Sequence, residues 1–189
     1  MRIYTRKGDD GSTGLLYGGR VRKDDRRIQA GGALDEAVAA LGLARSFVPK
    51  AAGLADLLLR IQRELFVAGA EIATLPENAG RLKGGVTKVT NGMVEALETE
   101  IDRVITEIGP LDGFIVPGAT PVASSIDLGR AMVRRAERGL VALMGPETPT
   151  ATWLQPYLNR LSDLLFMLAR LEENANQVRA PGIRQSEGG

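Results

Sequence analysis

The chain contains no cysteine and no histidine among its 189 residues. The first absence excludes disulfides, thiolate nucleophiles and thiolate metal ligands. The second removes the usual general base and the usual imidazole ligand of zinc or cobalt, so we predict no metal site built from side chains. Any chemistry must therefore use Arg, Lys, Asp, Glu, Ser, Thr or Asn, a metal held by oxygen, or a reactive cofactor.

Aromatic residues, net charge and long apolar runs are scarce as well. Aromatics make up 4% of the chain, too few for a base-stacking surface, and the formal net charge is only +1. We therefore expect no nucleic-acid partner, and any anion must be met by a local cluster of cations. No apolar run reaches the roughly 20 residues of a membrane span, and the sequence from Met1 to Tyr4 does not resemble a signal peptide. We expect no membrane partner and a cytoplasmic location.

Helical periodicity is the clearest positive signal in the chain. Apolar residues recur at spacings of three and four in five segments, which are separated by Gly- and Pro-rich breaks. Helices with one apolar stripe each, joined by short connections, predict an all-α, five-helix antiparallel bundle. The segments lie at about residues 24–47, 54–74, 91–108, 121–144 and from 156 into the 170s.

Length and composition indicate one globular domain. With 44% hydrophobic and 25% charged residues, the chain can bury a substantial core. We predict a single domain over residues 1–180, which consists of an N-terminal loop over 1–23 and the helical bundle over 24–175. Residues 181–189 are predicted to be a flexible tail.

The N-terminal loop has the composition of a polyphosphate-binding segment. Gly8, Gly11 and Gly14 allow backbone N–H groups to turn toward an anion. The spacing is not that of a Walker P-loop, and an ordinary polar turn near a terminus is the alternative. The candidate hydroxyl donors are Thr5, Ser12 and Thr13, and the candidate cations are Lys7 and Lys23.

A charged face lies inside the fourth helical segment. Burial of such groups is costly unless a charged or polar partner lies opposite. The face is either a solvated, self-paired stripe or a surface that opposes a groove or another subunit, and the pattern alone leaves both open. Its members are Asp127, Arg130, Arg134, Glu137 and Arg138.

The fifth segment carries a second polar face, which taken alone is explained by the first turn of an ordinary helix, where polar residues are common. It consists of Asn159, Ser162, Asp163, Phe166 and Arg170.

Two single residues are also candidates. Asp35 interrupts a stretch of small residues in the first helix, where a carboxylate is usually solvated or paired with an arginine; Arg130 is our choice of partner. Phe114 opens a weak strand signal that we interpret as an extended connection. An aromatic there is more often part of a core than a substrate contact.

Taken together, these segments resemble the PduO-type ATP:cob(I)alamin adenosyltransferases, from Ile3 to about Arg170. Each marker is weak alone, but their order and spacing over this length make a chance resemblance improbable. The markers are Tyr4-Thr5-x-x-Gly8-Asp9-x-Gly11 with Thr13, Lys23-Asp24-Asp25, Asp35-Glu36, Ile61-Gln62 with Leu65-Phe66, Gly69-Ala70-Glu71 with Ala73-Thr74, Phe114 to Gly118, Arg130, Arg134 to Arg138, and Tyr157 to Phe166.

The resemblance implies a homotrimer of five-helix bundles, with ATP and a corrinoid bound where neighbouring subunits meet. Asp35 and Arg130 match a pair that forms a salt bridge between subunits. Phe114 matches the aromatic near the lower face of the corrin, and Phe166 is expected to line the same pocket. The nucleotide is expected to contact Thr5, Arg6, Lys7, Gly8, Thr13, Gly14 and Lys23 of one subunit, and Arg134, Arg135, Ala136, Glu137, Arg138 and Asn159 of the next.

The chemistry that this family implies agrees with the missing residues. Cobalt(I) is itself a strong nucleophile, which attacks C5′ of ATP and expels tripolyphosphate to give adenosylcobalamin. The protein supplies placement and positive charge, so Asp35, Phe114, Arg130 and Arg134 are the expected catalytic residues. Mg²⁺ on the phosphate oxygens is expected to act with Lys7, Lys23, Arg134 and Arg138.

The resemblance also implies two protein partners, a flavin-dependent reductase and an adenosylcobalamin-dependent acceptor enzyme. The sequence departs from the family pattern at Lys7, Asp127 and Ala119, and residues 81–89 fit that pattern poorly. The alternatives are a non-catalytic carrier or sensor of ATP or adenosylcobalamin with the same fold, and a purely structural bundle.

Overall fold

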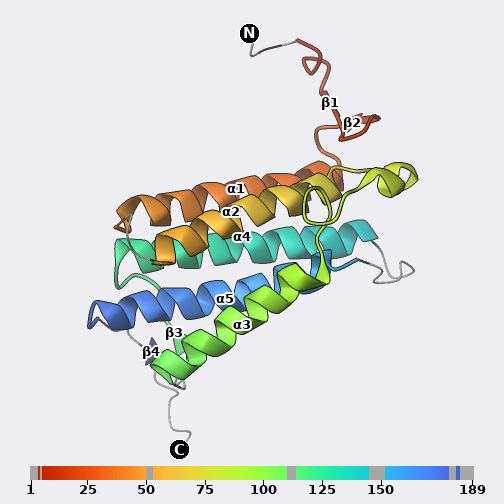
Figure 1. The fold of residues 1–189 in the computed structure, drawn as a ribbon. Helices are drawn as coiled ribbons and strands as arrows, with labels where there is room; N and C mark the ends of the chain where they lie inside the picture. Colours follow the sequence, from red (N-terminus) through yellow and green to blue (C-terminus); the bar gives the residue numbers. More distant parts are fainter. Residues whose placement is uncertain are drawn as a thin grey trace, which may run out of the picture.

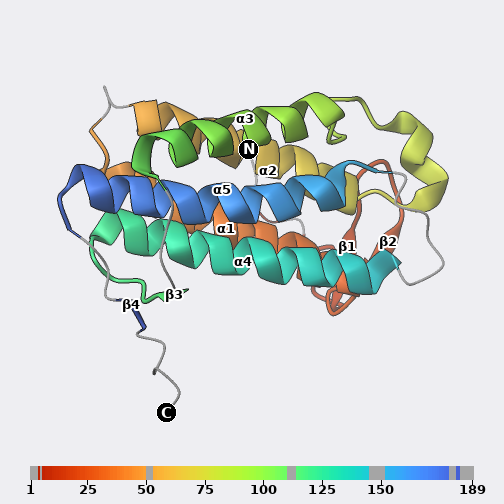
Figure 2. The same ribbon diagram turned by 90° about the horizontal axis from the view of Figure 1, so that it is seen from below.

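The computed structural model describes residue 4 and residues 6–49, 53–109, 114–144, 152–178 and 182–183. Within this part of the chain, five α-helices run alternately in opposite directions along one bundle (Figures 1 and 2). The predicted all-α five-helix bundle is therefore confirmed. The helices are α1 (Arg26–Phe47), α2 (Gly53–Ile72), α3 (Asn91–Ile108), α4 (Pro121–Met144) and α5 (Leu154–Ala175), with the 3-10 helix η1 (Pro76–Arg81) between α2 and α3.

Local sequence explains where the helices begin and end. The side chain of Asp25 caps α1 by accepting a hydrogen bond from the N–H of Arg27 at 2.8 Å. Thr120 caps α4 through the N–H of Ala123 at 3.0 Å, and Pro121 occupies the first helical position. These local signals are the reason why the predicted helix bounds agree with the structure to within two residues. Among the described helices, none combines the length and the apolar character required to cross a membrane.

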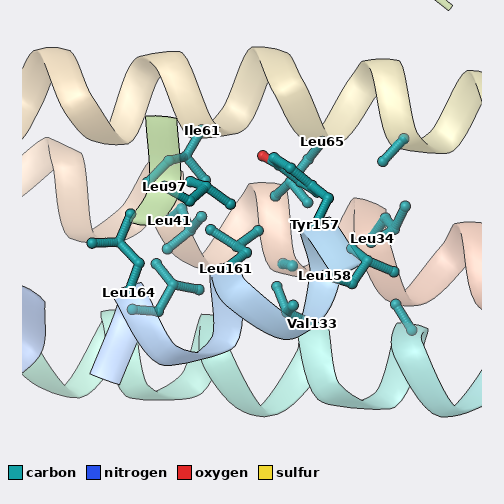
Figure 3. Close-up of a cluster of buried hydrophobic side chains, with 14 of the residues drawn as sticks. Leu34, Leu41, Ile61, Leu65, Leu97, Val133, Tyr157, Leu158, Leu161 and Leu164 are labelled. Carbon is teal, nitrogen blue, oxygen red and sulfur yellow. The ribbon is translucent and has the colours of Figure 1, made fainter. Parts of the chain in front are cut away.

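The core lies along α5, toward which the other four helices turn their leucines, isoleucines and valines (Figure 3). The hydroxyl of the buried Tyr157 donates a hydrogen bond to Glu64 Oε2 at 2.9 Å, so its polar end is satisfied inside the core. Burial beside Glu64 raises the pKa of Tyr157 well above its ordinary value of 10.0, which keeps the hydroxyl protonated. The labelled core residues are Leu34, Leu41, Ile61, Leu65, Leu97, Val133, Tyr157, Leu158, Leu161 and Leu164.

A short antiparallel hairpin precedes the bundle. Strand β1 (Ser12–Gly14) pairs with β2 (Arg20–Arg22) at the end of the bundle where α1 begins and α4 ends (Figure 1). The N–H of Leu16 donates to the carbonyl of Ala73 at 2.9 Å and so attaches the hairpin to the end of α2. Sequence analysis predicted only a loop here, because two polar strands of three residues are too short to show a strand period.

A second strand pair lies at the opposite end of the bundle, where α4 begins and α5 ends (Figure 1). Strand β3 (Phe114–Ile115) pairs antiparallel with β4 (Gly182–Ile183). Two residues of the predicted flexible tail are therefore held in a strand pair; the remainder of residues 181–189 lies outside the described residues. The pairing joins distant segments, so local sequence patterns contain no signal for it.

Candidate functional site

The β1–β2 hairpin gathers the glycines and one cation of the predicted polyphosphate-binding loop. A Cβ atom at Gly8 would lie 3.3 Å from Lys23 Nζ and 3.2 Å from the carbonyl oxygen of Ser12. Because glycine has no Cβ, the ammonium group can lie close against the loop backbone. The N–H of Lys23 also donates to the carbonyl of Gly11 at 2.9 Å. The structure thus brings Gly8 and Lys23 together, as a phosphate-binding loop requires.

The other loop candidates lie around this pair. Thr13 is half-buried in β1, where it pairs with Val21 of β2. Arg6, Lys7 and Gly14 are exposed. Thr5 lies outside the described residues.

Arg20, the first residue of β2, contacts the predicted phosphate-binding loop and was missed by sequence analysis. Its Nε donates to Ser12 Oγ at 3.1 Å, and its guanidinium also bonds the carbonyl of Lys7. Its Nη2 also lies 3.8 Å from Asp10 Oδ1. Arg20 therefore ties β2 to the loop that precedes β1, and only the strand register reveals this role.

A hollow of about 360 Å³ between α4 and α5 gathers residues that were predicted to contact the nucleotide from a neighbouring subunit. Arg134 and Arg138 stand one turn apart on α4, and both are exposed. Their cationic ends are therefore available to an anion. The hollow is lined by Arg134, Glu137, Arg138, Val141 and Asn159.

A chain of hydrogen bonds fixes the amide of Asn159 in this hollow. Its Nδ2 donates to Glu137 Oε1 at 3.2 Å, and its Oδ1 accepts from Arg160 Nη1 at 2.9 Å. Arg160 is held in turn by Glu98 of α3, through Nε at 2.9 Å. The carbonyl end of the amide therefore faces Arg160 and the amino end faces the hollow-lining Glu137. Sequence analysis did not assign Arg160 or Glu98 a role.

Two members of the predicted nucleotide-binding run, Arg135 and Ala136, do not line the α4–α5 hollow. Arg135 forms an ion pair with Glu36 of α1, and Ala136 is fully buried in the core. Side chains three and four apart share a helix face, so the run from Arg134 to Arg138 cannot present all five side chains to one ligand.

Asp35 and Arg130, predicted to pair between subunits, have different surroundings within one chain. Asp35 is exposed and lines a mainly apolar hollow between α1 and α2, beside the exposed ring of Phe66. Arg130 is half-buried and lies over the ring of Phe166, with its guanidinium carbon 5.2 Å from the ring centroid. Among the described residues, the ion pairs within 4.0 Å do not include this one.

Each of the two predicted polar faces, one on α4 and one on α5, contains both buried and exposed residues in the structure. Asp127 is 9% exposed and forms an ion pair with the buried Arg170 of α5, whereas Arg134 and Arg138 face outward. On α5, Ser162 is buried and Asp163 is exposed. Phe166, about one turn after Asp163 on α5, is half-buried. The structure places the backbone of Phe114 in β3, near the start of α4.

Comparison with known proteins yields a consistent result. The family model described as cobalamin adenosyltransferase matches residues 3–172. A corrinoid adenosyltransferase of Citrobacter freundii is 40% identical over 179 residues, which cover 95% of this chain and 99% of the relative. One from Bacillus subtilis is 42% identical over 174 residues, which cover 90% and 86%.

Solved structures agree with the sequence relatives. A variant of a PduO-type ATP:corrinoid adenosyltransferase from Lactobacillus reuteri, complexed with cobalamin and ATP, superposes with a TM-score of 0.86 at 31% identity, covering 98% of each chain. Another variant from the same organism, complexed with ATP, superposes with a TM-score of 0.84 at 31% identity and covers 96% of this chain and 100% of its own.

Proposed function

This chain belongs to the cobalamin adenosyltransferase family, and we propose that it transfers the 5′-deoxyadenosyl group of ATP to the cobalt of a reduced corrinoid. The electron pair of cobalt(I) forms the new Co–C5′ bond. The C5′–O bond breaks, and its electrons leave with tripolyphosphate. The observation that carries this proposal is the α4–α5 hollow, where two exposed arginines flank a fixed asparagine amide.

The protein's contribution to this displacement is position and positive charge. Arg134 and Arg138 bind the departing triphosphate, because a guanidinium can donate two parallel hydrogen bonds to phosphate oxygens. Lys23, held against Gly8, supplies a further cation from the hairpin. ATP enters as its Mg²⁺ complex, and the ion neutralises part of the same charge. Donors fixed before reaction stabilise the developing charge without reorganisation.

The complete site requires two copies of the chain. The α4–α5 hollow is lined only by residues of those two helices, whereas Gly8 and Lys23 flank the β1–β2 hairpin near the start of the chain. A head-to-tail contact that places one copy's hairpin on the next copy's α4 closes into a ring, and a trimer is the ring we propose. The exposed Asp35 then meets Arg130 of the adjacent copy.

The corrinoid lies on the β3 side of the same interface. We assign Phe114, which opens β3, to the lower face of the corrin, and Phe166 and Arg130, which contact each other, to the same pocket. An apolar ring beneath the cobalt leaves that metal without a lower protein ligand, which agrees with a chain that has no histidine.

The reaction also requires partners in the cell. A flavin-dependent reductase delivers the reduced corrinoid, and an adenosylcobalamin-dependent enzyme accepts the product. Both steps take place in the cytoplasm.

The decisive experiment is an anaerobic assay with chemically reduced cobalamin and ATP. We expect the protein to form a light-sensitive Co–C bond and to release tripolyphosphate in equal amounts. Replacement Arg134→Ala should lower kcat/KM for ATP about 100-fold or more, because a donor aimed at the charge that develops in the transition state is typically worth that much.

Arg103→Ala is the matched control, because Arg103 is an exposed arginine of α3 that pairs with Glu100 and Glu107. It should retain wild-type kinetics. Tight ATP binding by the wild-type protein without any Co–C bond would instead favour a carrier or sensor.

A further inference from the structure

A buried cluster of three charged side chains joins α4 to the end of α5. Arg170 Nη2 donates to Asp127 Oδ2 at 2.6 Å and to Glu173 Oε1 at 2.8 Å. The three side chains are only 3%, 7% and 4% exposed, respectively. Two carboxylates therefore share one guanidinium in the interior of the bundle.

A buried charge cluster is an unfavourable way to join two helices compared with apolar packing. Burial of ions costs more than their attraction returns unless the geometry is good and the remaining polar atoms are satisfied. Here Nε and Nη1 of Arg170 are buried and have no hydrogen-bond partner. Apolar side chains of similar volume would hold α4 against α5 equally well, so helix packing alone does not explain the cluster.

The cluster contacts the ring of Phe166. The guanidinium carbon of Arg170 lies over this ring, 5.2 Å from its centroid, and that of Arg130 lies over the same ring at the same distance. Cations are attracted to the face of an aromatic ring, most strongly where water is excluded. The excess carboxylate of the cluster offsets the second cation, so both arginines can lie beside one ring.

The two helices are also joined beyond the cluster. Thr120, at the start of α4, donates to the carboxylate of Glu172, the residue before Glu173. The C-terminal part of α5 is therefore joined to the α4 region by side-chain hydrogen bonds at two points, Arg170 with Asp127 and Glu172 with Thr120.

We propose that Asp127, Arg170 and Glu173 are positioning residues, which hold the Phe166 ring and, through it, Arg130 in the geometry that receives the corrinoid. The inference rests on the proposed function, which assigns Phe166 and Arg130 to the corrinoid pocket. None of the three positioning residues needs to touch the substrate.

The test is Asp127→Asn, which keeps the volume and one acceptor for Arg170 but removes a charge. We expect KM for cob(I)alamin to rise at least about fivefold, as expected when a hydrogen bond to a charged acceptor becomes one to a neutral acceptor, while KM for ATP stays within about twofold of wild type. Glu64→Gln is the matched control. It neutralises another partly buried carboxylate bonded to α5, but its partner Tyr157 lies two and a half turns of α5, roughly 13 Å, before Phe166. Both KM values should therefore stay unchanged.

A double-mutant cycle separates positioning from stability. In a Phe166→Leu background, Asp127→Asn should have little further effect on KM for cob(I)alamin, because its route of action is already removed; independent effects would simply add. Additive effects, or equal changes in KM for both substrates, would overturn the inference.

Glu173→Gln provides the same cycle if Asp127→Asn does not fold. Unfolding of both variants would assign the cluster to stability alone and would also overturn the inference. Failure of the proposed function has a different signature, since the wild-type protein itself would then form no Co–C bond.

Discussion

The buried carboxylate of Glu71 joins α2 to the segment that precedes α3. This residue of α2 is 8% exposed, and its Oε2 accepts a hydrogen bond from the N–H of Val89 at 2.7 Å. It thereby holds the segment before α3 against the end of α2, to which Leu16 also attaches the hairpin. Burial raises the pKa of Glu71 above its ordinary value of 4.5, and the hydrogen bond from Val89 only partly opposes that rise.

This raised pKa predicts a pH dependence of stability. The folded protein binds the Glu71 proton more tightly than the unfolded chain does. The contribution of Glu71 to the free energy of unfolding is therefore largest below pH 4.5 and is lost as the pH rises through the raised pKa. Glu71→Gln keeps an acceptor for Val89 and carries no charge, so the variant should have a higher Tm than wild type at neutral pH.

Melting curves recorded from pH 4.5 upward at fixed ionic strength measure this effect. Glu95→Gln, at an exposed position of α3, is the control and should follow the wild-type curve. Parallel curves for wild type and Glu71→Gln would contradict the prediction.

Among the helices, α1 and α4 approach each other closely because small residues line their contact. A Cβ atom at Gly139 of α4 would lie 3.1 Å from the Cβ of Ala30 and 3.4 Å from its Cα. At Gly129, ten residues earlier, it would lie 2.9 Å from Leu41 Cδ2. Glycine costs a helix roughly 0.5–1 kcal/mol relative to alanine, so these glycines are explained by the contact.

Gly139→Leu should therefore destabilise the protein although leucine favours helices. The added side chain must displace the backbone of Ala30, and overpacking of this kind costs about 1–3 kcal/mol. Chemical denaturation measures the free energy of unfolding.

Gly92→Ala in α3 is the matched control. A Cβ atom at Gly92 meets no atom within 4 Å, so this variant should be unchanged or stabilised by about 0.5 kcal/mol. An unaltered stability of Gly139→Leu would show that α4 can move away from α1.

At the scale of the whole molecule, the surfaces proposed to bind ATP come from separate parts of one chain. Gly8 and Lys23 flank the β1–β2 hairpin, and Arg134 belongs to the α4–α5 hollow. The apolar α1–α2 hollow exposes Phe66 and small residues, which is typical of a surface that another copy covers. A shared site explains both features.

A shared site can be tested by complementation. Lys23→Ala and Arg134→Ala should each be nearly inactive, but subunits exchanged between them should regain activity. In a randomly mixed ring, about a quarter of the interfaces combine the intact hairpin of one variant with the intact α4 of the other. Activity after joint refolding, together with the mass in solution by light scattering, measures this.

Each variant refolded alone is the control and should remain inactive. No recovery in mixtures that demonstrably contain both chains would place the whole site within one subunit and would argue against the shared interface.

The sequence by itself determined the helices and most candidates for the site. Periodicity, caps and breaks act over a few residues, so the bounds of α1 to α5 could be predicted from local pattern. The order of the motifs predicted the family, which the comparisons confirm. The hairpin's Arg20 and the strand pair β3–β4 escaped prediction, because each depends on residues that the local pattern does not connect.

Only the tertiary structure decided which charges are buried and which remain available. The pattern placed Asp127 on one face with Arg134, but the fold buries Asp127 against Arg170, 43 residues away, and leaves Arg134 exposed. It also turned Arg135 toward Glu36 rather than toward the hollow. The physical reason is that periodicity fixes which side chains share a helix face, whereas the environment of that face is set by whatever packs against it.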